Sequence, residues 1–265
     1  MNLIELTASD LGLTAGLVLL LGILISLNGL GLTRSLYVST VRMTVQLLLV
    51  GLVLEALFGA AHPLWVGLMG LVMLLLAGWE VMARQQRRIR GLAGYLIGVT
   101  AMALPAFTLA LMALVVIIDV RPWYTPQYAI PLLGMILGNT MTGIGLGLNS
   151  LTRGAATGRR AIEAQLLLGH DTRRATRGLR RDSLHTALLP TINMLTVAGI
   201  VSLPGMMTGQ ILSGTPPLEA VKYQIMMMML IASATGMGAM LAIELGARRL
   251  FDERQRLRLD RLAQA

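Results

Sequence analysis

Residues 163–190 read EAQLLLGHDTRRATRGLRRDSLHTALLP and hold five arginines within nine positions, from Arg173 to Arg181. The chain as a whole avoids charge: of its 265 residues 55% are hydrophobic and 13% are charged, and the mean hydropathy is +0.71. Such a composition is typical of polytopic membrane proteins. We therefore predict that this stretch is a hydrophilic loop between membrane spans, and its arginines decide how the spans are arranged.

Apolar stretches long enough to cross about 30 Å of hydrocarbon as helices recur along the chain. We predict an all-α polytopic membrane protein with about seven transmembrane helices, at residues 12–30, 36–58, 64–82, 92–118, 128–150, 186–203 and 220–247. The sixth signal is the weakest, because Pro190 and Asn193 interrupt it and a Gly/Pro-rich break follows at 204–214. With no long linker, residues 1–265 are predicted to form a single membrane domain, with 151–185 as its main loop.

The positive residues fall in alternate loops, which predicts the orientation. Eight arginines lie between Arg153 and Arg181 and six follow the last span, whereas the opposite loops hold only Arg121 and Lys222. Because basic loops stay cytoplasmic, we predict an outside N-terminus and a cytoplasmic C-terminus. The net charge of +9 then reflects topology at the membrane lipid surface. Nucleic-acid binding is not expected, because no aromatic residues interleave the basic runs.

Motifs for nucleotide, cofactor or metal chemistry are missing from the sequence. The only lysine is Lys222 and no G-x-x-x-x-G-K-[ST] occurs, so the chain cannot form a P-loop. Without cysteine it has no disulfide or thiolate metal site. Gly134 and Gly138 lie in an apolar span with no strand before them, which favours helix packing over dinucleotide binding. We therefore expect a non-enzyme with no cofactor of its own.

The energy source is also predicted to lie elsewhere. Gradient-driven transporters normally carry an ionisable group near mid-membrane. Here Glu80 and Glu244 fall at inner span ends, each four residues before an arginine, Arg84 and Arg248, that can neutralise it. This pattern indicates that another polypeptide supplies the energy.

The basic loop has features of a partner-binding element. Leu168, Ala175 and Leu179 recur at helical spacing within residues 163–184, and Gly169 can break the run into two short amphipathic helices. Such helices could dock in a groove of a partner. A solvated loop that faces anionic lipid is the alternative.

The loop and three further motifs resemble known transporters. Glu163, Ala164 and Gly169 match the E-A-A-x-x-x-G coupling loop of ABC-transporter permeases, although Gln165 replaces the second alanine and the later Leu-Pro is displaced. VRMTVQLLLVG (41–51), IPLLGMILGNTM (130–141) and VSLPGMMTGQILSGTPPLEAVKYQI (201–225) are similar to the Fet-type iron-export permeases, a family related to plant aluminium-tolerance permeases. The resemblance runs from about Leu13 to Arg249.

The resemblance implies an ABC half-transporter in the cell inner (plasma) membrane. Two copies of the chain would work with two copies of a separate ABC ATPase, which binds the ATP, and would export metal, with iron as the family-level expectation. Plant members of the related permeases have been connected with a nucleotide sugar, so the resemblance does not identify the substrate. A membrane adaptor or receptor, whose basic loops recruit a partner without transport, is the alternative function.

The candidate functional residues form two sets. The loop residues expected to meet the ATPase are Glu163, Gly169, Arg173, Arg174 and Arg177. The substrate-pathway candidates are polar or sulfur-bearing residues at membrane depth, namely Arg42, Gln46, Asn139, Met206, Met207 and Gln210. For most of these, helix packing is the competing interpretation. Methionine thioethers are soft ligands that suit Cu(I), and the break at 204–214 is our predicted outer gate.

Overall fold

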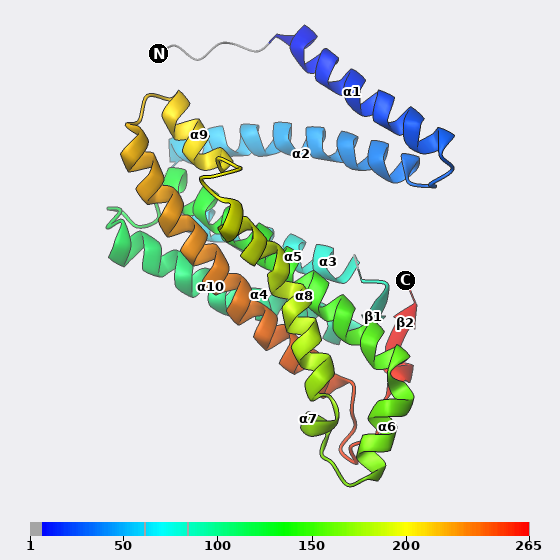
Figure 1. Ribbon diagram of the computed structural model, residues 1–265. Coiled ribbons are helices and arrows are strands. Elements are labelled where there is room, and N and C mark those ends of the chain that lie inside the picture. Colours follow the sequence, from blue (N-terminus) through cyan, green and yellow to red (C-terminus); the bar gives the residue numbers. More distant parts are fainter. Residues whose placement is uncertain (1–6, 61, 84, 265) are drawn as a thin grey trace.

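The computed structural model describes residues 7–60, 62–83 and 85–264, and these residues form an all-α protein (Figure 1). Ten α-helices are present in this part of the chain. They are α1 (Ala8–Leu27), α2 (Thr33–Ala60), α3 (Pro63–Ala83), α4 (Leu92–Met112), α5 (Pro126–Thr157), α6 (Arg159–Leu167), α7 (Thr172–Ala175), α8 (Arg177–Val197), α9 (Gly205–Leu212) and α10 (Pro217–Arg249). A π-turn, η1 (Ala113–Ile117), continues α4, a 3₁₀ turn, η2 (Leu259–Arg261), lies near the C-terminus, and strands β1 (Arg87–Ile89) and β2 (Leu262–Gln264) pair antiparallel. The predicted fold class is confirmed.

Within the described residues, six helices have the length and apolar composition needed to cross a membrane: α1, α2, α3, α4 with η1, α5 and α10. The predicted span at 186–203 is not among them. Its helix, α8, begins nine residues earlier at Arg177, carries three arginines in its first two turns, and ends at Val197. The predicted boundaries of this span are therefore wrong, although α8 runs beside α5 and α10 (Figure 1). That α8 makes a seventh crossing stays a prediction.

The core of the bundle is held by small residues. A Cβ atom added to Gly143 of α5 would lie 2.4 Å from Cγ2 of Thr235 in α10, and one added to Gly238 of α10 would lie 2.9 Å from Cγ2 of Thr140 in α5. The two helices thus approach at reciprocal glycine and threonine contacts, as membrane helices do at small-residue interfaces. Of the glycines predicted to pack, Gly134 does contact α3 through Met73, but Gly138 has open space beside it, so that prediction is wrong.

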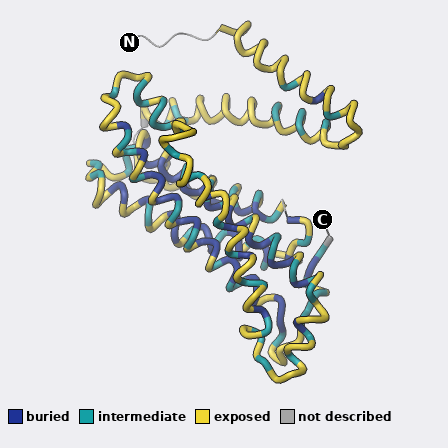
Figure 2. The backbone as a smooth tube through the Cα atoms, viewed as in Figure 1, coloured by how far each residue is buried: buried dark blue, intermediate teal, exposed yellow. Residues whose placement is uncertain are grey.

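The first two helices pack differently from the rest. Only 6% of the most apolar window of α1, and 6% of that of α2, is buried, against 50% for α5 and α10. The hairpin they form diverges from the bundle and is exposed along most of its length (Figure 2). Tyr37 donates a hydrogen bond to the carbonyl of Leu19 inside the hairpin, and an ion pair between Arg42 of α2 and Glu80 of α3 joins it to the bundle. The exposed apolar faces are suited to contact with lipid or with another chain.

The bundle has two distinct ends. One end carries α6, α7, the start of α8 and the C-terminal residues, and it is called the basic end below because the arginine-rich stretches gather there (Figure 1). The other end carries α9 and the starts of α5 and α10, and it is called the α9 end. The Gly/Pro-rich break predicted as irregular backbone at 204–214 instead contains the two turns of α9, which begin directly after Pro204. That part of the prediction is corrected.

Candidate functional site

At the basic end, the predicted pair of short helices is present as α6 and α7. Gly169 follows α6 in the left-handed region, with φ of +84°, which a glycine adopts without steric cost and which turns the chain toward α7. Asp171 then caps α7 by accepting a hydrogen bond of 2.7 Å from the backbone N–H of Arg174. Glu163 forms an ion pair of 2.8 Å with Arg159 one turn earlier on α6. Each residue thus has a local role that fixes the shape of the loop.

The apolar residues of this loop do not form one face. Ala175 and Leu179 pack against the core of the bundle, as the spacing predicts, but Leu168 is 72% exposed because the turn at Gly169 separates it from them. Leu167 beside it is 88% exposed. The loop therefore anchors itself with one set of apolar residues and presents another set to a partner or to lipid.

The arginines of the loop gather around an acidic residue of the bundle. Arg173, Arg174, Arg177 and Arg180 line a hollow of about 660 Å³ together with Asp171 and Glu244. Glu244 of α10 accepts hydrogen bonds from the guanidinium of Arg180 on α8 and, at 2.9 Å, from Nε of Arg248. The predicted pairing of Glu244 with Arg248 is confirmed, whereas the predicted pairing of Glu80 with Arg84 falls on a residue outside the described part of the chain.

Sequence reasoning missed Arg180, which is 64 residues from its partner Glu244. Only 16% of its side chain is exposed, although the sequence shows it as one more arginine in a basic run. No local signal distinguishes it from its neighbours. The ion pair ties the start of α8 to the end of α10, so the loop and the core helix are mechanically joined.

The C-terminal residues 250–264 fold back onto the basic end, which the sequence analysis did not predict. The carboxylate of Asp252 accepts hydrogen bonds from the backbone N–H groups of Arg254 and Arg256, which closes a turn. Strand β2 then pairs with β1 in the segment between α3 and α4. The alternation of leucine and arginine at residues 256–259 lies before β2, so it does not mark the strand itself, and no local signal in the sequence locates the pairing with β1.

Electrostatics hold this C-terminal segment in its shape at neutral pH. The hydrogen bond from the Arg256 backbone lowers the pKa of Asp252, and the guanidinium of Arg258 lowers the pKa of Asp260 to about 2. Both carboxylates are therefore charged at neutral pH and stay paired with arginines. These contacts hold the shape of the segment itself, whereas the pairing of β2 with β1 joins it to the basic end.

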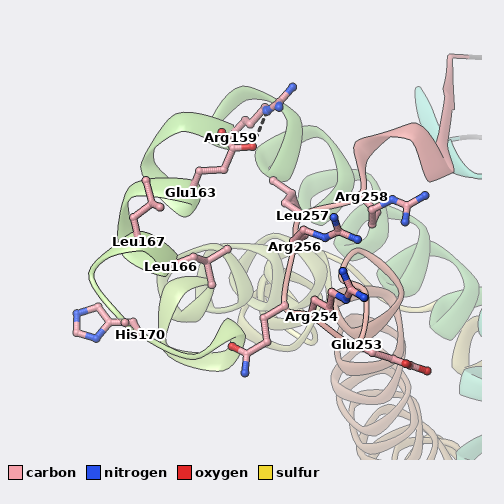
Figure 3. Close-up of a pocket in the computed structure, with 12 residues that line it drawn as sticks. Arg159, Glu163, Leu166, Leu167, His170, Glu253, Arg254, Arg256, Leu257 and Arg258 are labelled. Atoms are coloured by element: carbon pink, nitrogen blue, oxygen red, sulfur yellow. Dashed lines mark hydrogen bonds and ion pairs between the residues drawn. The ribbon is translucent and has the colours of Figure 1, made fainter.

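Between α6 and the C-terminal segment lies a pocket of about 870 Å³ (Figure 3). Its lining combines arginines from both sides, acidic residues and leucines, of which Leu167 is exposed: Arg159, Glu163, Leu166, Leu167, Gly169, His170, Glu253, Arg254, Gln255, Arg256, Leu257 and Arg258. His170 points away from the C-terminal segment (Figure 3). Of the predicted loop residues, Glu163 and Gly169 line this pocket and Arg173, Arg174 and Arg177 line the neighbouring hollow. A mixed surface of leucine and arginine is suited to an amphipathic segment of a partner.

The predicted pathway residues do not form one site. Met206 and Gln210 line a cavity at the α9 end, but Met207 is not part of its lining. The amide of Asn139 donates a hydrogen bond of 2.8 Å to the carbonyl of Met135 one turn earlier, so this group is satisfied within its own helix. Within the described residues, no cluster of three or more His, Asp or Glu could hold a metal ion.

Arg42 and Gln46 lie far from that cavity, on α2. Both line a shallow hollow on the surface of α2 with Tyr37 and three valines. Arg42 is paired with Glu80, which gives it a structural task at the joint between the α1–α2 hairpin and the bundle. The structure therefore does not bring these two residues to Met206 and Gln210.

Comparison with known proteins places the chain in a family. The model of the uncharacterised protein family UPF0014 matches residues 8–251. The chain belongs to the UPF0014 family. This UPF0014 protein is 38% identical to the membrane protein slr1647 of Synechocystis sp. over 96% of its own length and 98% of the relative. It is 32% identical to the probable iron export permease protein FetB of Escherichia coli, over 97% of each chain.

A plant relative shows the same family connection, and the predicted resemblance to Fet-type and aluminium-tolerance permeases is confirmed. ALUMINUM SENSITIVE 3 of Arabidopsis thaliana is 34% identical over 82% of this chain and 78% of the plant protein. No solved structure matches the UPF0014 chain. These relatives and the apolar helices together show a multi-pass membrane protein of a permease family.

Proposed function

We propose that this chain is the membrane-spanning permease subunit of an ATP-driven exporter whose ATP-binding subunit is a separate chain. The proposal rests most directly on the folded loop of α6, α7 and the start of α8, where the ion pair between Arg180 of α8 and Glu244 ties the loop to α10. A loop that only faces lipid needs no such connection to a core helix. A loop that receives force from a partner does need one.

The basic end would face the cytoplasm and bind the ATPase. Its arginines satisfy the positive-inside rule, and the sequence has no nucleotide-binding loop. Movement of the ATPase would displace α6 and α7, and the contacts of Arg180 would pass that displacement to α10, the helix that reaches the α9 end. The exposed Leu167 and Leu168 supply apolar contact area, and the arginines supply orientation.

Two copies of the chain would form the complete membrane part. The α1–α2 hairpin supports this proposal, because each helix buries only 6% of its most apolar window within one chain. A second copy or lipid would cover the rest. The relative in Escherichia coli is named a probable iron export permease, and metal export from the cytoplasm is therefore the activity we propose, with iron as the first substrate to test.

The test is to co-express the chain with an ABC-type ATPase from the same genome and to purify the complex through the membrane chain. We expect the ATPase to copurify and its ATP turnover in vesicles to depend on the membrane chain. Copurification without such dependence, and without metal transport, would instead favour a membrane adaptor that recruits its partner through the basic end. Failure of every ABC-type ATPase to copurify would refute the proposal.

A further inference from the structure

The cavity at the α9 end has a lining unlike the rest of the molecule. It has a volume of about 290 Å³ and lies between α5, α9 and α10. Four methionines from these three helices line it, namely Met135, Met206, Met226 and Met227. It is called the methionine cavity below. The four consecutive methionines of α10 cannot all share one face, but two of them, Met226 and Met227, line this cavity together with methionines of α5 and α9.

One lining residue of the methionine cavity, Gln210, carries an unpartnered oxygen. The side-chain oxygen Oε1 of Gln210 is buried and has no hydrogen-bond partner within the described residues. A buried oxygen without a donor is unfavourable unless something else binds it. The Gln210 oxygen is an acceptor, so the missing occupant is a donor or a cation.

The charge of the lining restricts that occupant further. None of the described residues that line the methionine cavity is an Asp, Glu, Lys or Arg. The cost of moving an ion out of water grows with the square of its charge, and here no carboxylate offsets it. Met135 and Met226 are each nine residues from the start of their helix, but Met206 and Gln127 lie in the first turns of α9 and α5, whose positive dipole ends raise the cost of each further positive charge. A divalent or trivalent hard ion therefore fits poorly, and a monovalent cation fits better.

Ligand chemistry points the same way. Thioether sulfur is a soft, uncharged ligand that selects Cu(I) among biological metals and binds Ag(I) in the same manner. We propose that the methionine cavity is a binding site for a soft monovalent metal cation of the Cu(I) class, held by methionine sulfur and by the amide oxygen of Gln210. The site lies beside α9. That it belongs to an export path rests on the proposed function, whereas metal binding at the site does not depend on that function.

The test measures equilibrium binding, independently of transport. The purified full-length chain is titrated with Ag(I), and with Cu(I) buffered by a chromophoric Cu(I) chelator, and the bound metal is counted by mass spectrometry. We expect one ion per chain and at least tenfold weaker binding of Fe(II) and Mn(II). No binding of either soft ion, or tighter binding of Fe(II), overturns the proposal. Because no ATPase is present, these outcomes leave the proposed function untouched.

Two matched variants locate the ion. Met135→Leu/Met206→Leu/Met226→Leu removes three sulfurs from the methionine cavity at positions that are only partly buried, while Met227 stays in place. Met229→Leu/Met237→Leu/Met240→Leu removes three from exposed positions on α10. We expect the first variant to lose at least tenfold in Ag(I) affinity and the second to match the parent. Equal affinities in both variants place the ion elsewhere and overturn the proposal.

If the triple variant in the cavity does not fold, Gln210→Leu provides the second test. This substitution removes the buried oxygen and leaves every sulfur in place. We expect Ag(I) affinity to fall several-fold with no loss of protein after size-exclusion chromatography. Unchanged affinity would show that the cavity oxygen does not contact the ion and would contradict the proposed ligand set.

Discussion

The two ends of the bundle satisfy their charges in different ways. At the α9 end, the ion pairs among the described residues are local: Asp119 pairs with Arg121 and Glu219 with Lys222, two and three residues apart. At the basic end, Arg180 reaches Glu244 across 64 residues of sequence. Local pairs leave neighbouring elements free to move relative to one another, whereas long-range pairs fix them.

This difference assigns separate tasks to the two ends. The basic end is a connected body in which the loop, α8, α10 and the C-terminal segment hold one another, as a surface that receives force must. The α9 end has an uncharged cavity that is lined in part by α9 through Met206 and Gln210. Such an element can move without breaking a long-range ion pair. The predictions below test this division, beginning with the helices that join the two ends.

The largest effect is expected where α4, α5 and α10 touch midway between the ends. A Cβ at Gly238 would lie 3.0 Å from the carbonyl oxygen of Ala101 and 2.9 Å from Thr140, so Gly238→Val must push backbone apart. We expect a loss of stability of about 3 kcal/mol, seen as a lower temperature of half-loss in size-exclusion chromatography. Gly236→Val is the control, since its nearest neighbour is Leu188 at 3.9 Å. Equal losses of stability in Gly238→Val and Gly236→Val would show that the close contact at Gly238 is not what holds α4, α5 and α10 together.

A smaller effect is expected at the turn between α6 and α7. Gly169→Ala places a Cβ at φ of +84°, which costs roughly 1–2 kcal/mol and should distort the loop. We expect weaker binding of the ATPase, by about tenfold, in a pull-down titration. Gly178→Ala is the matched control, because Gly178 lies in α8, has open space around it and gains helix propensity on substitution. If both variants bind the ATPase equally strongly, the turn at Gly169 does not contribute to ATPase binding.

The ion pair between the loop and α10 is expected to matter more for coupling than for stability. Arg180→Gln leaves Glu244 with Arg248 as its partner, so the loss of stability should be only about 1 kcal/mol. We expect the ATPase to bind normally while ATP turnover no longer responds to substrate. Arg181→Gln changes the exposed neighbour and should leave both properties intact. A full substrate response in Arg180→Gln would contradict the mechanical link.

The smallest effect concerns pH and the C-terminal segment. Because hydrogen bonds lower the pKa of Asp252 below 3.8, the stability they add is fully present above that value and is lost as pH falls through the lowered pKa. The segment should therefore stay in place between pH 5 and 8. The measurement is the rate of amide hydrogen exchange in residues 252–264, which should show the same protection across this range. Asp252→Asn should raise exchange there several-fold at pH 7, and Glu253→Gln should not. Exchange that is the same in all three proteins would show that Asp252 does not hold the turn.

The sequence predicted the membrane spans well but not how they pack. Hydropathy located α1 and α10 equally, although the window of α1 is 6% buried and that of α10 is 50% buried. Lipid and protein interior are both apolar, so hydropathy cannot tell them apart. The distinguishing residues are small ones such as Gly143 and Gly238, and which glycines pack depends on helix rotation and crossing. For that reason Gly134 was predicted correctly and Gly138 was not.

The candidate site was predicted in part, for the same physical reason. Glu163, Gly169 and the loop arginines lie within one short segment, so local spacing was sufficient to group them at two neighbouring hollows, and their contact with an ATPase stays a prediction. Contacts over long sequence distances, such as Arg42 with Glu80 and Arg180 with Glu244, have no local signature. Met206 was predicted as a pathway candidate, and that role stays a prediction. Met135 and Met226, which line the same cavity, come from other helices and became visible only in the folded chain.

The most direct test of the central claim asks which end of the bundle touches the ATPase. The chain has no cysteine, so one introduced cysteine carries a photo-crosslinker at a single chosen position. Leu167→Cys marks the basic end and Leu212→Cys marks the α9 end, at side chains that are 88% and 54% exposed. After illumination of the complex in membranes, the account predicts a covalent adduct of the ATPase with the Leu167→Cys chain and none with the Leu212→Cys chain. An adduct at Leu212→Cys, or none at Leu167→Cys in a complex that still copurifies, would contradict it.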